Sequence, residues 1–146
     1  MDDKQYIFGS IFLLANKLQA IGDSLGGELP IKQWYLLVMI SIMEQELPTM
    51  TEVARFVGGT RQNTTRMLQA LEKKGYVNLT MVPEDRTSMR VIISQSGKDY
   101  LEQTSPVGNA MLEKIFISID AQSLSTVSDM FRKLFENIER WQTVDN

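Results

Sequence analysis

The segment from Thr49 to Gly97 constrains the fold of this chain more than any other part of its sequence. Two short helical stretches stand on either side of Gly58-Gly59, and two β-like runs separated by a polar turn follow them. A glycine pair at that place predicts a tight turn, because glycine adopts the left-handed backbone that ends a helix at little steric cost. The pattern therefore indicates a helix-turn-helix followed by a β-hairpin.

The second of these helices begins with polar side chains that can recognise DNA. Thr60 is a good N-cap, and no acidic residue follows it until Glu72. Arginine pairs with guanine, while glutamine and asparagine pair with adenine in the major groove. A solvated polar face, which any surface helix has, is the alternative interpretation. The candidate DNA contacts of this helix are Thr60, Arg61, Gln62, Asn63, Thr65 and Arg66, with Thr64, Met67, Leu68 and Leu71 predicted to face inward.

Hydrophobic spacing predicts a mainly α-helical chain with one β-hairpin. Apolar residues recur at intervals of four and three from Ile7 to Leu25, which is typical of a helix packed on other helices. Gly22 and the Gly26-Gly27 pair are expected to interrupt this helix and form a loop. Helices are expected at 5–21, 31–44, 49–57, 60–74, 95–119 and from Asp120 onward, with strands at 76–82 and 89–94 and a turn at 83–88.

Two further patterns concern the hairpin and the helix after it. Val77, Leu79 and Met81 alternate with polar residues, so they are predicted to lie on one buried face of the first strand. Pro106 and Gly108 fall inside the next helix and predict a kink or a break there, because proline lacks the N–H that a helix interior needs.

Charge is divided unevenly along the chain, although its net value is only −3. Residues 55–90 carry seven basic and three acidic side chains, a balance of +4, whereas residues 1–54 carry three basic and seven acidic ones. A basic middle between acidic ends favours a DNA-binding surface at the helix-turn-helix. A chance distribution of solvated charges is the alternative explanation for the same balance.

Composition excludes several other classes of protein. The chain has no cysteine and no histidine, so disulfides are excluded and the usual zinc ligands and general bases are missing. We therefore predict no metal site, no cofactor and no enzymatic activity. Asp2 and Asp3 stand where a signal peptide is positively charged, and no apolar run approaches the roughly 20 residues that span a bilayer. A cytoplasmic protein is expected.

Several short motifs follow one another along the chain: Gln33-Trp34, Leu36-Leu37, Glu52-Val53-Ala54, Leu71-Glu72-Lys73-Lys74-Gly75-Tyr76-Val77, Pro83-Glu84-Asp85-Arg86 and Ile93-Ser94-Gln95-Ser96-Gly97. With these motifs, the order of the elements resembles the MarR family of bacterial transcriptional regulators over nearly the whole chain. The resemblance implies a mainly α-helical winged helix-turn-helix with N- and C-terminal dimerisation helices. It implies a single domain of residues 1–146, in which 5–29 and 98–146 are dimerisation helices and 30–97 is the DNA-binding lobe.

The resemblance also implies how such a chain acts. It predicts a homodimer that binds double-stranded DNA at a pseudo-palindromic operator as a repressor and leaves it when a small lipophilic or aromatic molecule binds. The apolar stripes at 7–25 and 127–141 support a dimer independently, because they exceed what one small winged helix covers. Intramolecular packing is the alternative for both stripes. The implied ligand residues, each of which also suits an ordinary core position, are Phe12, Trp34, Met39, Met43 and Phe116.

The predicted wing departs from the family pattern at one position. The family wing reads Asp-x-Arg, and its arginine enters the minor groove, but here Thr87 follows Asp85 at that spacing. Arg86 at the tip is the predicted groove contact in its place, and Arg90 is a further candidate for a phosphate contact. A winged-helix module for protein association, with weak or no operator binding, is the alternative function that this departure favours.

Overall fold

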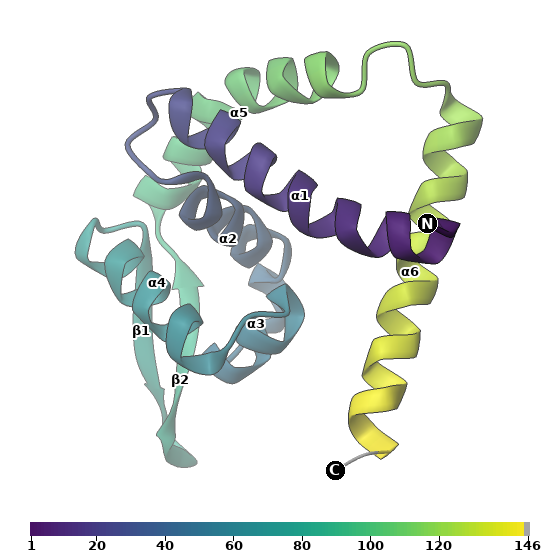
Figure 1. Cartoon of the computed structure of the whole chain (residues 1–146). Helices are drawn as coiled ribbons and strands as arrows, with labels where there is room; N and C mark the ends of the chain where they lie inside the picture. Colours follow the sequence, from purple (N-terminus) through teal and green to yellow (C-terminus); the bar gives the residue numbers. More distant parts are fainter. Residues whose placement is uncertain (145–146) are drawn as a thin grey trace. The chain divides into compact units, whose positions relative to one another are not determined.

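The computed structural model describes residues 1–144, so residues 145–146 of the predicted C-terminal dimerisation segment lie outside the described part. The chain divides into two compact units, Met1–Pro106 and Val107–Asn146. Figure 1 shows the elements in chain order, and the predicted mainly α-helical fold with a β-hairpin wing is confirmed. The elements are α1 (Asp3–Ser24), α2 (Ile31–Ile42), the 3₁₀-helix η1 (Glu44–Glu46), α3 (Met50–Val57), α4 (Arg61–Lys73), β1 (Val77–Val82), β2 (Asp85–Ile93), α5 (Gln95–Ile115) and α6 (Ala121–Val144).

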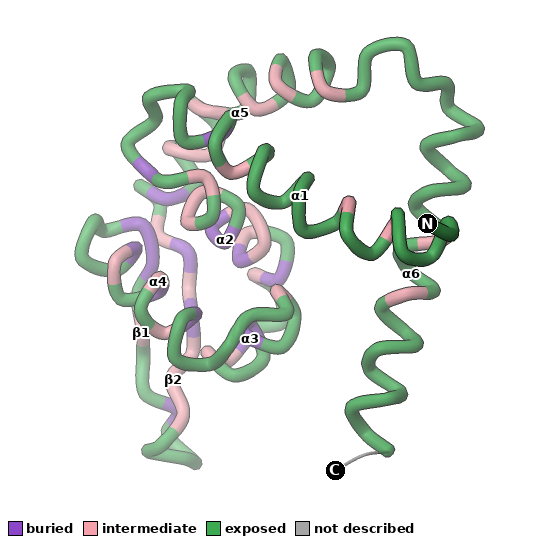
Figure 2. The backbone as a smooth tube through the Cα atoms, viewed as in Figure 1, coloured by how far each residue is buried: buried purple, intermediate pink, exposed green. Residues whose placement is uncertain are grey.

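The core of the first unit lies around α2, as its apolar sequence predicts. Leu37 and Ile40 of α2 are completely buried, and side chains from α3, α4 and both strands pack with them. Figure 2 shows the buried segments gathered where α2, α3, α4 and the hairpin meet. This core fixes α4 and the hairpin on one support. Its fully buried members outside α2 include Val53, Leu68, Leu71, Val77 and Val91.

Local caps determine where the two short helices begin and end, as predicted. Thr49 and Glu52 form a capping box, in which each side chain accepts a hydrogen bond from the other residue's backbone N–H. Gly58 ends α3 in the left-handed conformation, with a φ of 69°. Thr60 then caps α4, because its hydroxyl accepts from the Asn63 N–H at 3.1 Å.

The prediction that Gly22 interrupts the first helix is wrong. Helix α1 continues to Ser24, and Gly22 is a buried residue inside it. A Cβ atom at Gly22 would lie 2.4 Å from Cγ1 of Ile31, the first residue of α2. The glycine is therefore explained by the close approach of α2 to α1.

The hairpin is tighter than predicted, and its first strand is less buried. Strand β2 already begins at Asp85, which pairs with Val82, so the turn is Pro83-Glu84 instead of six residues. Met81 is 59% exposed, which contradicts its predicted burial. The strand register shifts between Met81 and Val82, and Val82 is the buried side chain at that end of the hairpin.

The sequence predicts a kink or a break at Pro106; α5 continues through this residue, so the break is wrong and the kink stays a prediction. Proline cannot donate to the Glu102 carbonyl, but the Ser105 hydroxyl donates to it at 3.2 Å. The helix ends at Ile115, before the predicted residue 119, and Ser118 takes a left-handed φ of 63° in the following turn.

The second unit carries an uncovered apolar stripe on α6. The Asp120 side chain caps this helix by accepting from the Ser123 N–H at 2.8 Å, as predicted. Val127, Phe131 and Ile138 are exposed, each between 38% and 48%, and Trp141 is 70% exposed. Within residues 1–144, no helix is long and apolar enough to cross a membrane.

Candidate nucleic-acid interface

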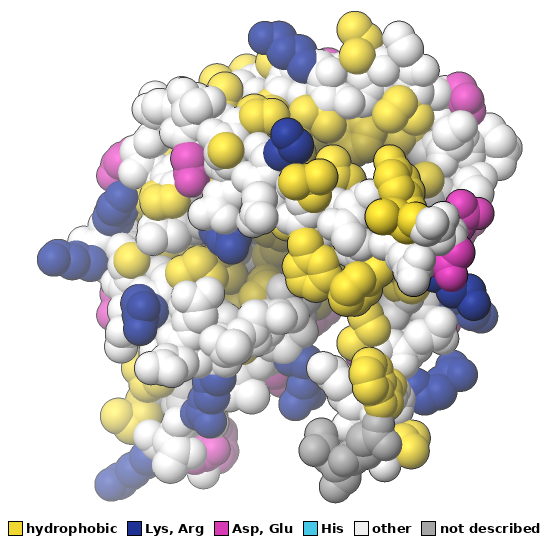
Figure 3. All heavy atoms as spheres, viewed as in Figure 1, with side chains coloured by type: hydrophobic (Ala, Val, Ile, Leu, Met, Phe, Trp, Pro, Cys, Tyr) yellow, Lys and Arg dark blue, Asp and Glu magenta, His cyan; other side chains and the backbone are white. Residues whose placement is uncertain are grey.

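Helix α4 separates an apolar face from a polar one, as predicted. Thr64, Leu68 and Leu71 are buried, and Met67 is half-buried. Arg61 and Arg66 are exposed, and neither guanidinium has a hydrogen bond or ion pair within residues 1–144. Figure 3 shows Lys and Arg side chains distributed over the region of α4 and the hairpin. Of the other candidates on α4, Thr60, Gln62 and Asn63 are exposed and Thr65 is half-buried.

The start of α4 is suited to an anion. Its first turn carries no acidic side chain, and the unsatisfied N–H groups of a helix N-terminus carry partial positive charge. Arg61 adds a full charge in the same turn. Phosphate oxygens are the anionic groups that DNA presents to such a helix end.

The end of α4 is attached to the hairpin and to the segment before α2. The Glu72 carboxylate accepts from the Leu79 N–H at 2.8 Å, which joins α4 to β1. The Lys74 ammonium donates to the backbone carbonyl of Glu28 at 3.0 Å. Helix α4 is therefore held at its C-terminal end while its N-terminal half stays exposed.

Two tyrosines complete this attachment. The Tyr76 hydroxyl donates to the Glu28 carboxylate at 2.7 Å, and the Leu29 N–H donates to the Tyr100 hydroxyl at 3.2 Å. The two rings stack with their centroids 4.8 Å apart. Burial, followed by the hydrogen bond to Glu28, raises the pKa of Tyr76 to about 12. We call Glu28, Leu29, Lys74, Tyr76 and Tyr100 the tyrosine clamp.

Sequence reasoning missed the tyrosine clamp. The side-chain hydrogen bonds that form it join residues 46, 48 and 71 positions apart. Neither helical periodicity nor a turn signal reports a contact at such separation. Only alternating hydrophobicity could mark Tyr76 as buried, and it does not reveal the partner of its hydroxyl group.

The wing tip is organised by Asp85. Its Oδ1 accepts from the Thr87 N–H at 3.0 Å and from the Thr87 hydroxyl at 2.6 Å, while its Oδ2 accepts from the Ser88 hydroxyl at 2.8 Å. These hydrogen bonds, the one from the Thr87 hydroxyl most strongly, lower the pKa of the Asp85 carboxyl. Arg86 is exposed, and no residue of the described chain bonds to its side chain.

Arg90 lies closer to the base of the hairpin. It is half-buried, and its guanidinium donates to the backbone carbonyl of Leu47. Strand β2 forms a bridge between Arg90 and Thr49, and the Val91 N–H donates to the Pro48 carbonyl at 2.8 Å. Arg90 therefore helps to attach the hairpin to the segment that leads into α3.

The five predicted ligand residues are divided between the two units and differ in exposure. Phe12 is 60% exposed on α1, Met43 is buried and Met39 is half-buried. Trp34 packs against the core, and its indole N–H donates to the Thr104 hydroxyl at 2.8 Å. Phe116 belongs to the second unit, where it lines a hollow between the end of α5 and the start of α6.

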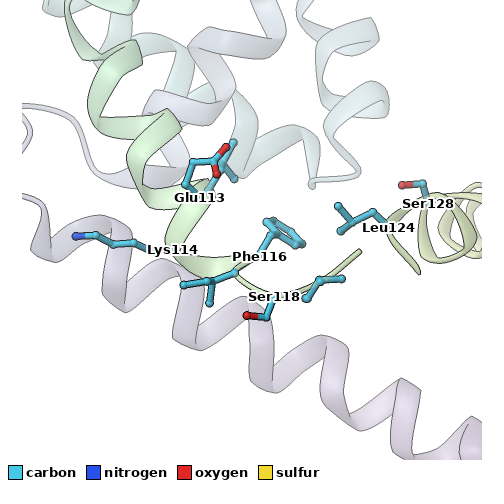
Figure 4. Close-up of a pocket in the computed structure, with 9 residues that line it drawn as sticks. Glu113, Lys114, Phe116, Ser118, Leu124 and Ser128 are labelled. Atoms are coloured by element: carbon cyan, nitrogen blue, oxygen red, sulfur yellow. The ribbon is translucent and has the colours of Figure 1, made fainter. Parts of the chain in front are cut away.

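Figure 4 shows Phe116 and Leu124 facing each other across that hollow. Its lining combines apolar side chains with Glu113, Lys114, Ser118 and Ser128. Among residues 1–144, no group of three acidic side chains is placed to hold a metal ion.

Comparison with known proteins gives one consistent relationship. Residues 28–86 match the model of the MarR family. The match begins at Glu28 of the tyrosine clamp and ends at Arg86 of the wing tip. The HTH-type transcriptional regulator PapX of Escherichia coli is 24% identical over 101 residues, which cover 69% of this chain and 62% of PapX. The chain thus spans less than two thirds of the length of that relative.

Solved structures share the fold over nearly the whole chain. A MarR/EmrR family transcriptional regulator from Acinetobacter sp. ADP1 superimposes with a TM-score of 0.81 at 15% identity, covering 96% of this chain and 99% of that one. A MarR family transcriptional regulator from Streptomyces coelicolor, solved in complex with DNA, gives a TM-score of 0.79 at 21% identity, covering 91% and 86%. Residues 28–86 therefore match the MarR family, and the fold of nearly the whole chain is similar to that of MarR family regulators.

Proposed function

We propose that this chain is a sequence-specific DNA-binding transcriptional regulator rather than an enzyme. The observation that carries the proposal is the exposed N-terminal half of α4, where Arg61 and Arg66 have no partner within the described chain. Two unpaired arginines in the exposed half of one helix suit a surface that meets phosphates and base edges. The relative from Streptomyces coelicolor, whose structure contains DNA, supports the same use of the fold.

The proposed contacts follow from side-chain chemistry. Arg61, Gln62, Asn63 and Arg66 reach base edges in the major groove, and Thr60 and Thr65 lie at the phosphate backbone. Arg86 enters the minor groove from the wing. Arg90 contacts a phosphate with the N–H groups that Leu47 leaves free.

The regulator acts as a homodimer on a pseudo-palindromic operator. Its α1 stripe is uncovered in the single chain, with Leu14 at 53% and Leu18 at 41% exposure, and α6 carries a second stripe of the same kind. Pairing two chains through such stripes removes apolar surface from water and presents two copies of α4 to one duplex. Figure 3 shows hydrophobic side chains at the surface over α1 and along α6.

We further propose repression that a small lipophilic or aromatic effector relieves. Methionine side chains adapt to apolar molecules of varied shape; Met39 of α2 is half-buried, and Met43, which follows α2, is buried. Phe12 and Trp34 are the aromatic candidates in the first unit, and Phe116 is a separate candidate in the second unit. In the second unit, Phe116 already lines a hollow that has apolar walls.

A protein-association module is the second candidate function. It is favoured by the wing tip, where Glu84 and Asp85 flank Arg86 and Thr87 stands in the place of the family arginine. Two acids at the tip disfavour close approach to phosphates. This candidate predicts weak DNA binding with no preference for sequence.

Fluorescence anisotropy distinguishes the two functions. The protein is titrated against labelled DNA from upstream of its own gene and against random DNA, each at two salt concentrations. A regulator binds the upstream DNA more tightly, and its affinity falls steeply with salt because several phosphates are neutralised. Equal and weak binding to both DNAs would reject the proposal in favour of the association module.

A further inference from the structure

We propose that Asp85 is a positioning residue of the wing, which presents Arg86 as the cation that contacts DNA. This inference rests on the proposed function and extends it to a residue whose own charge has the wrong sign for DNA. The supporting geometry lies at the tip of the hairpin, between the Val82–Asp85 pair and the Met81–Met89 pair.

The wing tip contains an irregular segment with no partner strand. Met81 pairs with Met89 and Val82 pairs with Asp85, so residues 86–88 have no residue opposite them on β1. An insertion of this kind redirects side chains instead of continuing the ladder. Without further contacts, three unpaired residues in an exposed hairpin would sample many conformations.

Asp85 supplies those contacts. One carboxylate oxygen accepts from the Thr87 N–H and hydroxyl, and the other accepts from the Ser88 hydroxyl. The three hydrogen bonds close the segment around Arg86, which lies between its two ends. The Thr87 hydroxyl is a donor within this closed turn, so the residue that replaces the family arginine has a role of its own.

The charges of the wing tip make its contact with DNA depend on Arg86. The hairpin residues 77–93 contain two arginines, and Arg90 lies away from the tip, near the base of the hairpin, where its guanidinium donates to the Leu47 carbonyl. Arg86 is exposed, with no bonded partner in the described chain, next to Glu84 and Asp85. The tip therefore has one positive and two negative charges, and its contact with DNA requires Arg86 to be held ahead of the two carboxylates.

Two substitutions that make the same charge change test the proposal. Asp85→Ala and Glu84→Ala each remove one carboxylate from adjacent exposed positions, but only Asp85 holds hydrogen bonds there. If both acids only repel DNA, both variants bind the upstream DNA more tightly. We expect Glu84→Ala to bind equally well or more tightly, and Asp85→Ala to bind roughly threefold to tenfold more weakly.

A double-mutant cycle shows whether Asp85 acts through Arg86. We expect Arg86→Ala to weaken binding about tenfold and to reduce the salt slope by about one. We expect the double variant Asp85→Ala/Arg86→Ala to bind no more weakly than Arg86→Ala alone, because the position of a missing side chain has no effect. Circular dichroism should show the parent's helical content in all variants, because Glu84, Asp85 and Arg86 are exposed residues of the wing tip and belong to no helix.

The outcomes separate the inference from the proposed function. Tight parent binding with an Asp85→Ala variant that behaves like Glu84→Ala overturns the positioning role and leaves the regulator intact. Losses that add in the double variant also overturn it, because Asp85 would then act independently of Arg86. A parent chain that prefers no DNA sequence overturns the proposed function itself.

Discussion

At the scale of single residues, Arg61 and Arg66 of α4 lack, within the described chain, the partners that Arg90 and Arg132 have. Arg132 forms an ion pair with Asp129 at 2.6 Å, and Arg90 donates to a backbone carbonyl. Arg61 and Arg66 have neither kind of contact within the described residues. Their side chains contribute little to folding, so their loss should be measurable in binding alone.

Arg66→Ala should weaken specific DNA binding by about 1–3 kcal/mol while leaving the free energy of unfolding unchanged. Anisotropy titration and urea unfolding measure the two quantities. Arg140→Ala is a matched control, because Arg140 is an exposed arginine of α6, remote in sequence from α4. Unchanged affinity in the Arg66 variant would show that the polar face of α4 is directed away from DNA.

Tyr76 predicts how stability depends on alkaline pH. Its folded pKa of about 12 lies above the value of about 10 for an unfolded tyrosine. Between these values the unfolded chain loses the phenolic proton while the native chain keeps it, so stability falls as pH rises through this window. Below about pH 10 the stabilisation is fully present.

Tyr76→Phe should remove part of that alkaline slope. The measurement is urea unfolding of parent and variant from about pH 9 to about pH 11. Tyr6→Phe is the control, because Tyr6 is 65% exposed on α1. A slope that stays the same in the Tyr76 variant and falls in the Tyr6 variant would contradict the assignment.

At the scale of elements, helix α1 contains two glycines with opposite surroundings. A Cβ at Gly22 would overlap Ile31, whereas a Cβ at Gly9 would meet nothing within 4 Å. Alanine stabilises an exposed helix position by about 1 kcal/mol relative to glycine. Forcing an atom into a packed contact costs about 1–3 kcal/mol.

The same substitution should therefore have opposite signs at the two positions. Gly22→Ala should lower the free energy of unfolding, and Gly9→Ala should raise it or leave it unchanged. Chemical unfolding of both variants checks this. Stabilisation by Gly22→Ala would mean that α1 and α2 are not packed as closely as Gly22 and Ile31 indicate.

Elements were predictable from sequence where their causes are local. The capping box of Thr49 and Glu52 and the N-cap at Thr60 involve residues three positions apart, so a short motif reports them. Gly22 resembled a helix breaker because its cause, Ile31, comes from the next helix. Pro106 lies inside α5, where the Ser105 hydroxyl donates to the Glu102 carbonyl that the proline leaves without a backbone donor, and residue type alone does not report this contact.

The candidate DNA-binding surface was also predictable only where its causes are local. Helical periodicity places Arg61 and Arg66 outward and Leu68 inward, because burial of one stripe determines the other face. The hydrogen bonds of Asp85 with Thr87 and Ser88 depend on a shift in strand register. Alternation of polar and apolar residues does not encode such a shift. It also predicted that Met81 is buried, although Met81 is exposed.

At the scale of the whole molecule, the uncovered stripes of α1 and α6 predict the state of association. Leu18→Glu places a charge in the α1 stripe and should convert a dimer into a monomer, with loss of operator binding. Sedimentation velocity measures the mass. Lys17→Glu introduces the same side chain at the neighbouring position, which points to a different face of the helix.

Lys17→Glu should remain dimeric. If Leu18→Glu also remains dimeric and keeps full affinity, the α1 stripe is not the dimer surface. A monomeric parent would reject the dimer proposal entirely, whatever the variants do.

The tyrosine clamp determines how long a fragment must be if the helix-turn-helix and hairpin are to be grafted into another protein. Its members lie on the segment before α2, at the end of α4 and on α5. Residues that precede α4 in the sequence and residues that follow it therefore both hold it in place. A graft limited to residues 49–97 would leave Tyr76 without Glu28 and its ring without Tyr100. It would also lack the buried leucines of α2. The smallest fragment that keeps these contacts must therefore begin before Glu28 and extend beyond Thr104, whose hydroxyl accepts the indole N–H of Trp34.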